Sequence, residues 1–121
     1  MSILHIHHVS VIVADTERSL EFYCDVLGLG VLDRRSNLTF PGAWLEVGEQ
    51  QIHLLELPDP YAIADKPEYG GRDRHLALGT DDFKTIRTKL DAAKIPYQLS
   101  SSGRDALFCR DPDGNAIEIV G

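Results

Sequence analysis

The sequence predicts an α+β fold built from two copies of a βαβββ module within a chain of 121 residues. His75 follows His8 by 67 residues, and Asp82 follows Asp15 by the same 67, so both halves read histidine, six residues, aspartate and then a helical pattern. Near the end of each half, residues 52–54 match residues 117–119 at an offset of 65. Loop length absorbs the difference of two residues, and the halves are predicted to be copies.

The first half begins with a predicted strand over residues 6–13, which are rich in β-branched side chains. Asp15 follows as a good N-cap, apolar residues recur at helical spacing from Thr16 to Leu27, and Gly28 stands where a C-terminal cap glycine belongs. These features predict an amphipathic helix. Three further strands are predicted at residues 29–32, 43–47 and 51–57, the last two joined by a tight turn.

The second half follows a predicted irregular connection over residues 58–72, which is rich in proline and glycine. Beyond it the order repeats, with a helix expected to begin after Asp81 or Asp82. The predicted strands are residues 75–78, 97–99, 107–109 and 116–120. The last two form a hairpin, whose turn over residues 111–115 contains proline and glycine.

Composition limits the partners and the location that we expect. Twelve Lys and Arg against nineteen Asp and Glu give a net charge of −7, which opposes binding to nucleic acid or to an anionic membrane and leaves a small molecule as the expected partner. The length predicts a single domain, with modules at about 4–57 and 73–121. The start of the chain lacks a signal-peptide pattern, and with only Cys24 and Cys109 this predicts a cytoplasmic protein with structural thiols.

Four metal-competent side chains occupy matched positions of the two modules. Alternate side chains of a strand share a face, so the apolar rows of the first and last strands are expected to lie under the helices. His8 and His53 then point to the opposite face of the first module, and His75 and Glu118 to the same face of the second. If the modules pack with these faces together, the four side chains converge. They suit a divalent ion such as Fe, Zn, Ni or Mn with open positions for substrate.

Two alternatives concern the ligands of the first module. Glu56 could replace His53 as the ligand from this strand, although the alternation of side chains places Glu56 with the apolar row that faces the helix. His5 and His7 are expected to face solvent, and a metal-binding cluster at the amino end is a competing interpretation.

Several other side chains remain open between a functional and a structural role. Five arginines could bind a substrate carboxylate or phosphate, or could simply occupy exposed loops: Arg34, Arg35, Arg72, Arg74 and Arg104. Trp44 and Tyr97 could line the cavity or fill a core or an interface between subunits, and parity alone does not decide between these roles.

Three segments together resemble a known superfamily, the vicinal oxygen chelate proteins. The segments are residues 8–11, 15–29 and 111–118. The superfamily includes glyoxalase I, methylmalonyl-CoA epimerase, extradiol dioxygenases, and fosfomycin- and bleomycin-resistance proteins. The resemblance implies paired βαβββ modules that enclose a metal site, and a homodimer. His8, His75 and Glu118 fall on the ligand positions of this family, and His53 falls where glyoxalase I has Glu and the epimerase has Gln.

The resemblance implies three functions, of which the first is glyoxalase I-like isomerase or lyase chemistry. In that case a small oxygenated substrate is chelated by the metal, and Glu118 is both a ligand and the catalytic base. If His53 is set aside, His8, His75 and Glu118 resemble the 2-His-1-carboxylate triad of an Fe(II) dioxygenase. The third possibility is a metal-free protein that sequesters a ligand, as bleomycin-resistance proteins do.

Overall fold

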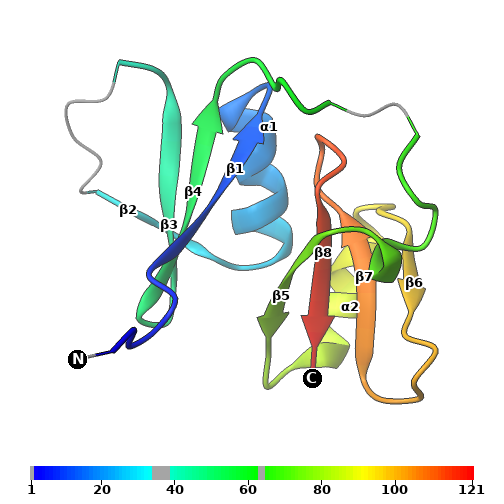
Figure 1. The fold of residues 1–121 in the computed structure, drawn as a ribbon. Coiled ribbons are helices and arrows are strands. Elements are labelled where there is room, and N and C mark those ends of the chain that lie inside the picture. The colour runs from blue at the N-terminus through cyan, green and yellow to red at the C-terminus, as the bar shows by residue number, and fades with distance from the viewer. Residues whose placement is uncertain (1, 34–38, 63–64) are drawn as a thin grey trace. The chain divides into compact units, whose positions relative to one another are not determined.

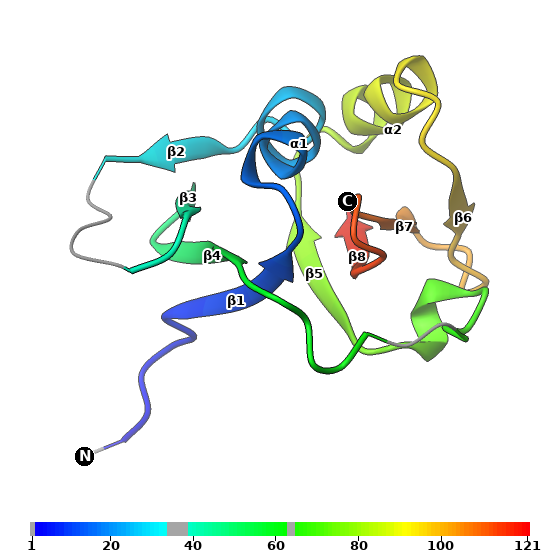
Figure 2. The ribbon, with the colours of Figure 1, turned by 90° about the horizontal axis from the view of Figure 1, so that it is seen from above.

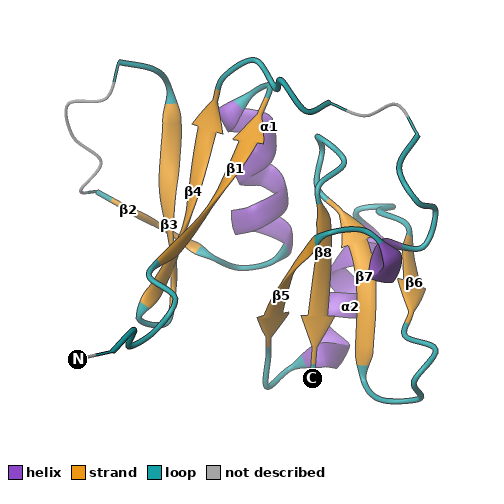
Figure 3. Ribbon diagram, viewed as in Figure 1, coloured by secondary structure: helices purple, strands orange, loops and turns teal. Residues whose placement is uncertain are grey.

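Both predicted modules are present in the computed structural model, each as a four-stranded mixed sheet with a helix against it (Figure 1; Figure 3). The structure describes residues 2–33, 39–62 and 65–121. The chain divides into two compact units, Met1–Pro60 and Tyr61–Gly121. The α+β class with paired βαβββ modules is confirmed.

The first unit has the sheet order β1-β4-β3-β2, in which β1 and β4 are parallel and the other pairs antiparallel. Its strands are β1 (His8–Val13), β2 (Gly30–Leu32), β3 (Gly42–Val47) and β4 (Gln50–Glu56). The predicted first strand began at Ile6, two residues too early. The ladder starts at the first residues of β4: His8 pairs with Gln51, whose N–H also donates to the carbonyl of His7 at 3.1 Å.

The helix of this unit changes type along its length. It runs as α1 (Thr16–Leu20) and then as the π-helix η1 (Glu21–Val26), so the prediction of one regular helix to Leu27 was wrong in its second part. There the N–H of Leu27 donates to the carbonyl of Phe22, five residues earlier. Phe22 is buried in this wider turn, although its position does not fit the regular helical spacing of apolar residues from which the helix was predicted.

The ends of this helix follow the sequence signals. The carboxylate of Asp15 accepts a hydrogen bond from the N–H of Arg18 at 3.4 Å, as expected of an N-cap. Gly28 has a φ of +83°, the left-handed conformation that favours glycine after a helix. Thr16 and Ser19 are buried on the side of the helix that faces the core.

The second unit repeats this arrangement, with sheet order β5-β8-β7-β6 and a parallel pair of β5 and β8. Its elements are β5 (His75–Gly79), α2 (Phe83–Ala92), β6 (Tyr97–Leu99), β7 (Ala106–Arg110) and β8 (Ala116–Val120). Asp82 caps α2 by accepting from the N–H of Thr85 at 3.2 Å. Seen from above, α2 lies along one side of this sheet (Figure 2).

The registers of the two parallel pairs are equivalent. Ser10 lies opposite His53 in the first unit, and Ala77 lies opposite Glu118 in the second, at the offsets of 67 and 65 residues that the sequence predicts. The helix-facing rows of β4 and β8 form the two cores, and their members are fully or almost fully buried: Ile52, Leu54, Ile117 and Ile119. Equivalent strand positions therefore aim His53 and Glu118 away from the helix in each unit.

The connection that leads into β5 is irregular, as predicted, apart from the 3-10 turn η2 (Gly70–Arg72). This turn lies so close to β7 that a Cβ on Gly70 would lie 3.0 Å from the Cβ of Phe108. The guanidinium of Arg110 donates to the carbonyl of Pro67 at 2.6 Å and to the carboxylate of Asp73 at 2.8 Å. Arg110 thereby holds the connection onto the β7–β8 hairpin. Among the described residues, no helix is long and apolar enough to cross a membrane.

Candidate metal centre

The two histidines of the first unit stack on each other. The ring centroids of His8 on β1 and His53 on β4 are 4.0 Å apart, with 14° between the ring planes. His8 is exposed and His53 is buried, with 8% of its surface accessible. The alternation of β1 and β4 thus brings both imidazoles to the same face of the sheet.

Two neighbours fix the orientation of His53. Trp44, its cross-strand partner on β3, stacks on the imidazole with centroids 4.4 Å apart and 10° between the planes. Nε2 of His53 lies 2.7 Å from the side-chain oxygen of Gln51, and because that oxygen only accepts, Nε2 carries the proton and Nδ1 the lone pair. Strand alternation left the location of Trp44 open between a cavity, a core and a subunit interface. The contact of Gln51 with His53 was not predicted from the sequence.

The pKa of His53 is lowered by burial first, and then by the nearby imidazoles of His8 and His7. A neutral imidazole is the form that binds a metal ion. His7 and His5 are exposed, as expected, but Nδ1 of His7 also lies 2.8 Å from Nδ1 of His8, so His7 belongs to the edge of this stack. The lone pair of a ring nitrogen lies in the plane of its ring. In two stacked rings the lone pairs therefore point in parallel directions, and both imidazoles could bind one ion only if the exposed His8 ring rotates.

The second unit brings His75 on β5 close to Glu118 on β8. Nε2 of His75 is 3.2 Å from Oε1 of Glu118. Nδ1 of the same ring lies 2.8 Å from the main-chain carbonyl oxygen of Asp73. A carbonyl only accepts, so Nδ1 carries a proton and Nε2 is the ring nitrogen that faces the carboxylate oxygen. A cation between Nε2 and Oε1 would have one imidazole nitrogen and one carboxylate oxygen as ligands.

The spacing of these two donors fits a divalent ion. Ligand atoms about 2.1 Å from one ion lie about 3.0 Å apart at right angles and about 3.4 Å apart in a tetrahedron. The 3.2 Å between His75 Nε2 and Glu118 Oε1 falls within this range. Metal-binding histidines typically donate their other ring N–H to a carbonyl or carboxylate, as His75 does to Asp73.

Two further side chains complete the surroundings of Glu118. Its side chain is 6% exposed, and Oε2 accepts a hydrogen bond from Nη2 of Arg104 at 2.8 Å. The ring of Phe108, the cross-strand neighbour of Glu118 on β7, meets the ring of His75 nearly edge to face, with centroids 5.2 Å apart. The sequence left Arg104 open between substrate binding and a place in an exposed loop, and the structure pairs it with Glu118.

Each unit therefore supplies a pair of candidate ligands. Among the described residues of either unit, no three His, Cys, Asp or Glu side chains gather around one point. The convergence of His8 and His53 with His75 and Glu118 stays a prediction. Imidazole and carboxylate donors suit a divalent first-row metal, and the second pair has the spacing to hold one.

The alternative ligand of the first unit has another role. Oε1 of Glu56 accepts a hydrogen bond from the main-chain N–H of Thr16 at 2.8 Å. Its carboxylate thus caps the first turn of α1, where a negative charge is favourable. The structure places Glu56 on the helix side of the sheet, as parity indicates, and away from the His8–His53 stack.

The remaining candidates lie elsewhere. Arg72 and Arg74 are exposed, and residues 34–35 lie outside the described ranges. The hydroxyl of Tyr97 accepts from Nε of Arg87 on α2 at 2.9 Å, which places it on the helix side of the second sheet. Tyr97 is half-buried, and its hydroxyl joins β6 to the exposed Arg87 of α2.

Both cysteines are free thiols in positions that suppress reactivity. Burial, followed by the charge of Asp111, raises the pKa of Cys109 to about 12. Burial and Asp25 raise the pKa of Cys24, which is half-buried. Thiolates are the reactive species, so the structural role predicted for both residues stands.

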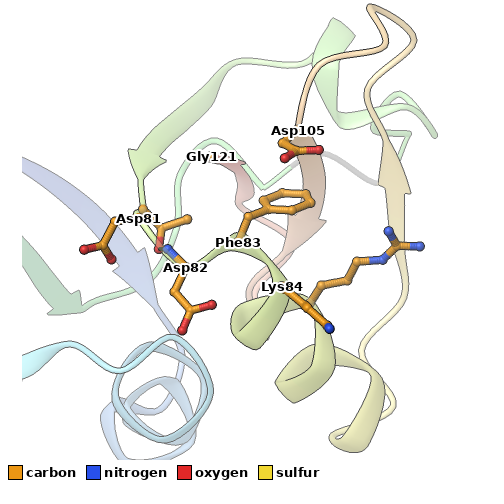
Figure 4. Close-up of a pocket in the computed structure, with 8 residues that line it drawn as sticks. Asp81, Asp82, Phe83, Lys84, Asp105 and Gly121 are labelled. Carbon is orange, nitrogen blue, oxygen red and sulfur yellow. Dashed lines mark hydrogen bonds between the residues drawn. The ribbon is translucent and has the colours of Figure 1, made fainter.

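A shallow hollow of about 480 Å³ opens in the second unit at the start of α2. Figure 4 shows its lining, in which Asp81, Asp82 and Asp105 surround Phe83. Sequence reasoning missed it because Asp105 is far from the helix start in the chain. The hollow contains none of the candidate metal ligands, and it is not the predicted centre.

The fold agrees with comparisons to known proteins. The family model described as "Glyoxalase/Bleomycin resistance protein/Dioxygenase superfamily" matches residues 5–119. The chain belongs to this superfamily. Members such as glyoxalase I and the dioxygenases are metal-dependent.

Individual relatives carry names from more than one branch of the superfamily. The chain is 35% identical to "Glyoxylase I 4" of Arabidopsis thaliana, over 94% of this chain and 68% of that one. It is 31% identical to a "Probable lactoylglutathione lyase" of Vibrio cholerae, over 99% and 92%. A "Catechol-2,3-dioxygenase" of Bacillus subtilis is also 31% identical, over 95% of this chain and 40% of the longer enzyme.

Solved structures show the same fold. A putative glyoxalase family protein from Bacillus anthracis superposes with a TM-score of 0.77 at 22% identity, covering 98% of this chain and 95% of that one. This likeness concerns the fold and does not extend to substrate.

Proposed function

We propose that this protein is a metal-dependent enzyme of the glyoxalase I type, an isomerase or lyase that acts on a small oxygenated substrate. The observation that carries the proposal is the His75–Glu118 pair, whose donor atoms are 3.2 Å apart with the other ring nitrogen tied to the Asp73 carbonyl. His8 and His53 are the ligands contributed by the first unit. A divalent ion held by these residues would supply Lewis-acid polarisation of substrate oxygens.

The residues of the chain have distinct tasks in this proposal. Glu118 binds the metal and also acts as the base. It removes the proton from the substrate carbon next to the carbonyl group and returns it to the adjacent carbon. Its burial keeps water from competing for that proton. His75 is held in one tautomer by Asp73, so it does not exchange roles with Glu118. Trp44, stacked on His53, supplies an apolar wall beside the first pair.

The test is an isomerase assay of protein loaded in turn with Ni, Zn, Mn or Fe(II). The substrate is the hemithioacetal of methylglyoxal and glutathione, chosen because a relative is named a probable lactoylglutathione lyase. We expect thioester formation with at least one metal, and a loss of 100-fold or more, roughly the scale of general acid–base catalysis, in Glu118→Gln. Glu56→Gln is the matched control and should keep the activity. Metal-loaded protein without turnover contradicts the proposed reaction.

A second function is an Fe(II) dioxygenase, which the relative named catechol-2,3-dioxygenase favours. If His53 is not a ligand, the set His8, His75 and Glu118 is a 2-His-1-carboxylate triad. Oxygen consumption with a catechol by the Fe(II)-loaded protein, with no isomerase activity, would establish this function in place of the first. Ligand binding with no bound metal would indicate a sequestering protein.

We also propose that the two units form one domain, that the protein is a homodimer, and that it is cytoplasmic. The match of one family model to residues 5–119 supports a single domain. Free Cys24 and Cys109 suit a reducing compartment. Light scattering coupled to size exclusion measures the oligomeric state, and a mass of one chain would contradict the dimer.

A further inference from the structure

The two oxygens of the Glu118 carboxylate have different partners. Oε2 receives a hydrogen bond of 2.8 Å from Nη2 of Arg104, and Oε1 faces Nε2 of His75 at 3.2 Å. The shorter contact is a charge-assisted hydrogen bond, and its length is typical of a strong one. The longer contact involves Nε2 of His75, because Nδ1 of the same ring bonds the Asp73 carbonyl. One oxygen is therefore held by Arg104, and the other faces the second candidate ligand of this unit.

A buried carboxylate needs a fixed positive partner. Only 6% of the Glu118 side chain is exposed, whereas 57% of the Arg104 side chain is exposed. An unpaired charge at such a buried position would be costly, and the guanidinium supplies the compensating charge from the solvent side. Because Arg104 uses a single nitrogen and a single oxygen, this pairing leaves Oε1 unobstructed.

The loop that carries Arg104 is held by its own hydrogen bonds. The N–H of Ser100 donates to the carbonyl of Ala106 at 2.8 Å, which closes the loop between β6 and β7. Within it, Oγ of Ser102 lies 2.8 Å from Oγ of Ser100 and accepts from the N–H of Arg104 at 3.4 Å. The backbone of Arg104 is thus placed before its side chain reaches Glu118, so the contact requires little ordering.

We propose that Arg104 is a positioning residue for the metal centre: it holds Oε2 of Glu118 and so reserves Oε1 alone, next to Nε2 of His75, for a divalent cation. This inference rests on the proposed function and adds to it a residue outside the ligand set. Partners of this kind, which bond a ligand without touching the ion, typically change metal affinity by about 10–100-fold.

Simple electrostatics gives the opposite expectation for Arg104, which makes the inference testable. Removing a positive charge near a cation site should strengthen binding of the cation, because repulsion decreases. Loss of a positioning contact should weaken it, because the freed carboxylate adopts other orientations. The sign of the change in metal affinity therefore distinguishes positioning from mere charge.

The experiment measures Zn(II) dissociation constants by chelator competition for the full chain and three variants. We expect Arg104→Ala to bind about 10–100-fold more weakly than wild type and Arg104→Lys to fall between them. Arg72→Ala is the matched control, since Arg72 is an exposed arginine of the same unit. It should bind within about twofold of wild type, because screening weakens exposed charges.

A second readout is the infrared spectrum of the Zn(II)-loaded protein. In wild type, Glu118 is expected to bind the ion through one oxygen. This gives a large separation in frequency between the asymmetric and symmetric stretches of the carboxylate. In Arg104→Ala this separation should narrow as Oε2 also reaches the ion. If Arg104→Ala does not fold, as judged by circular dichroism, Arg104→Met provides the same comparison, because it removes the donor and keeps a long side chain.

The outcomes separate the inference from the function on which it rests. Wild-type protein that binds no Zn(II) overturns both. Wild-type binding together with equal or tighter binding in Arg104→Ala, or with an unchanged infrared separation, overturns the role of Arg104 and leaves the metal centre standing.

Discussion

Nδ1 of His75 and the main-chain oxygen of Asp73 are 2.8 Å apart, and this contact decides which ring nitrogen faces Glu118. The Asp73 side chain is in turn bound by Arg110 at 2.8 Å. A chain of contacts thus runs from the β7–β8 hairpin through the connection before β5 to the candidate ligands. The orientation of His75 depends on a residue that belongs to neither β5 nor β8.

Arg110→Ala should destabilise the protein by about 2 kcal/mol, because it removes a charge-assisted hydrogen bond to Asp73 and the hydrogen bond to the Pro67 carbonyl. Urea unfolding followed by circular dichroism measures this change. Arg72→Ala, an exposed arginine, should stay within about 0.5 kcal/mol of wild type. Equal midpoints for Arg110→Ala and wild type would show that the connection is held in another way.

Glu56→Ala should reduce stability by about 1 kcal/mol and leave metal content unchanged. The reason is that Glu56 accepts the N–H of Thr16 at the start of α1, a capping contact, and does not reach the stacked histidines. Thermal unfolding and elemental analysis of the same preparation provide the two readouts. Loss of metal with no loss of stability would make Glu56 a ligand after all.

Acid should weaken the metal-free protein through His53. Burial and the neighbouring imidazoles lower the pKa of His53 in the folded state, so the unfolded chain binds more protons once the pH falls below its usual value of about 6.5. The contribution is complete above that pH and is lost as the pH falls towards the lower, folded-state pKa. Urea unfolding in the presence of a chelator at pH 7.5, 6.5 and 5.5 should show a steeper decline for wild type than for His53→Gln. Parallel declines would refute this role.

Neither thiol should react readily in the folded protein. Burial and Asp111 raise the pKa of Cys109 to about 12, so at pH 7.5 almost no thiolate is present. We expect slow alkylation by iodoacetamide at Cys24, slower alkylation at Cys109, and rapid reaction of both in urea, as read by mass spectrometry. Fast modification of native Cys109 would be inconsistent with its burial.

The repeat explains how much of the fold was predictable from the sequence. Identical spacing from His8 to Asp15 and from His75 to Asp82 fixed two modules with the same element order. Strand alternation then placed each pair of candidate ligands on the face away from the helix. Both inferences depend on local periodicity, which a sequence displays directly.

What could not be predicted depends on contacts between distant parts of the chain or on backbone detail. Apolar periodicity does not distinguish an α-helix from a π-helix, so the turn that buries Phe22 was missed. Nothing in the sequence around Arg104 indicates that its partner is Glu118, fourteen residues later and across a hairpin. The stacking of Trp44 on His53 requires the β3–β4 register, which the turn length alone leaves open.

The most direct test asks whether the two pairs of ligands hold one ion. Zn(II) stoichiometry and affinity are measured for wild type, His8→Ala, His75→Ala and the double variant. We predict one ion per chain in wild type and a loss of more than about 100-fold in affinity for each single variant, beyond the effect of an outer contact. If His8→Ala binds the metal as wild type does while His75→Ala loses it, the result would contradict a shared centre.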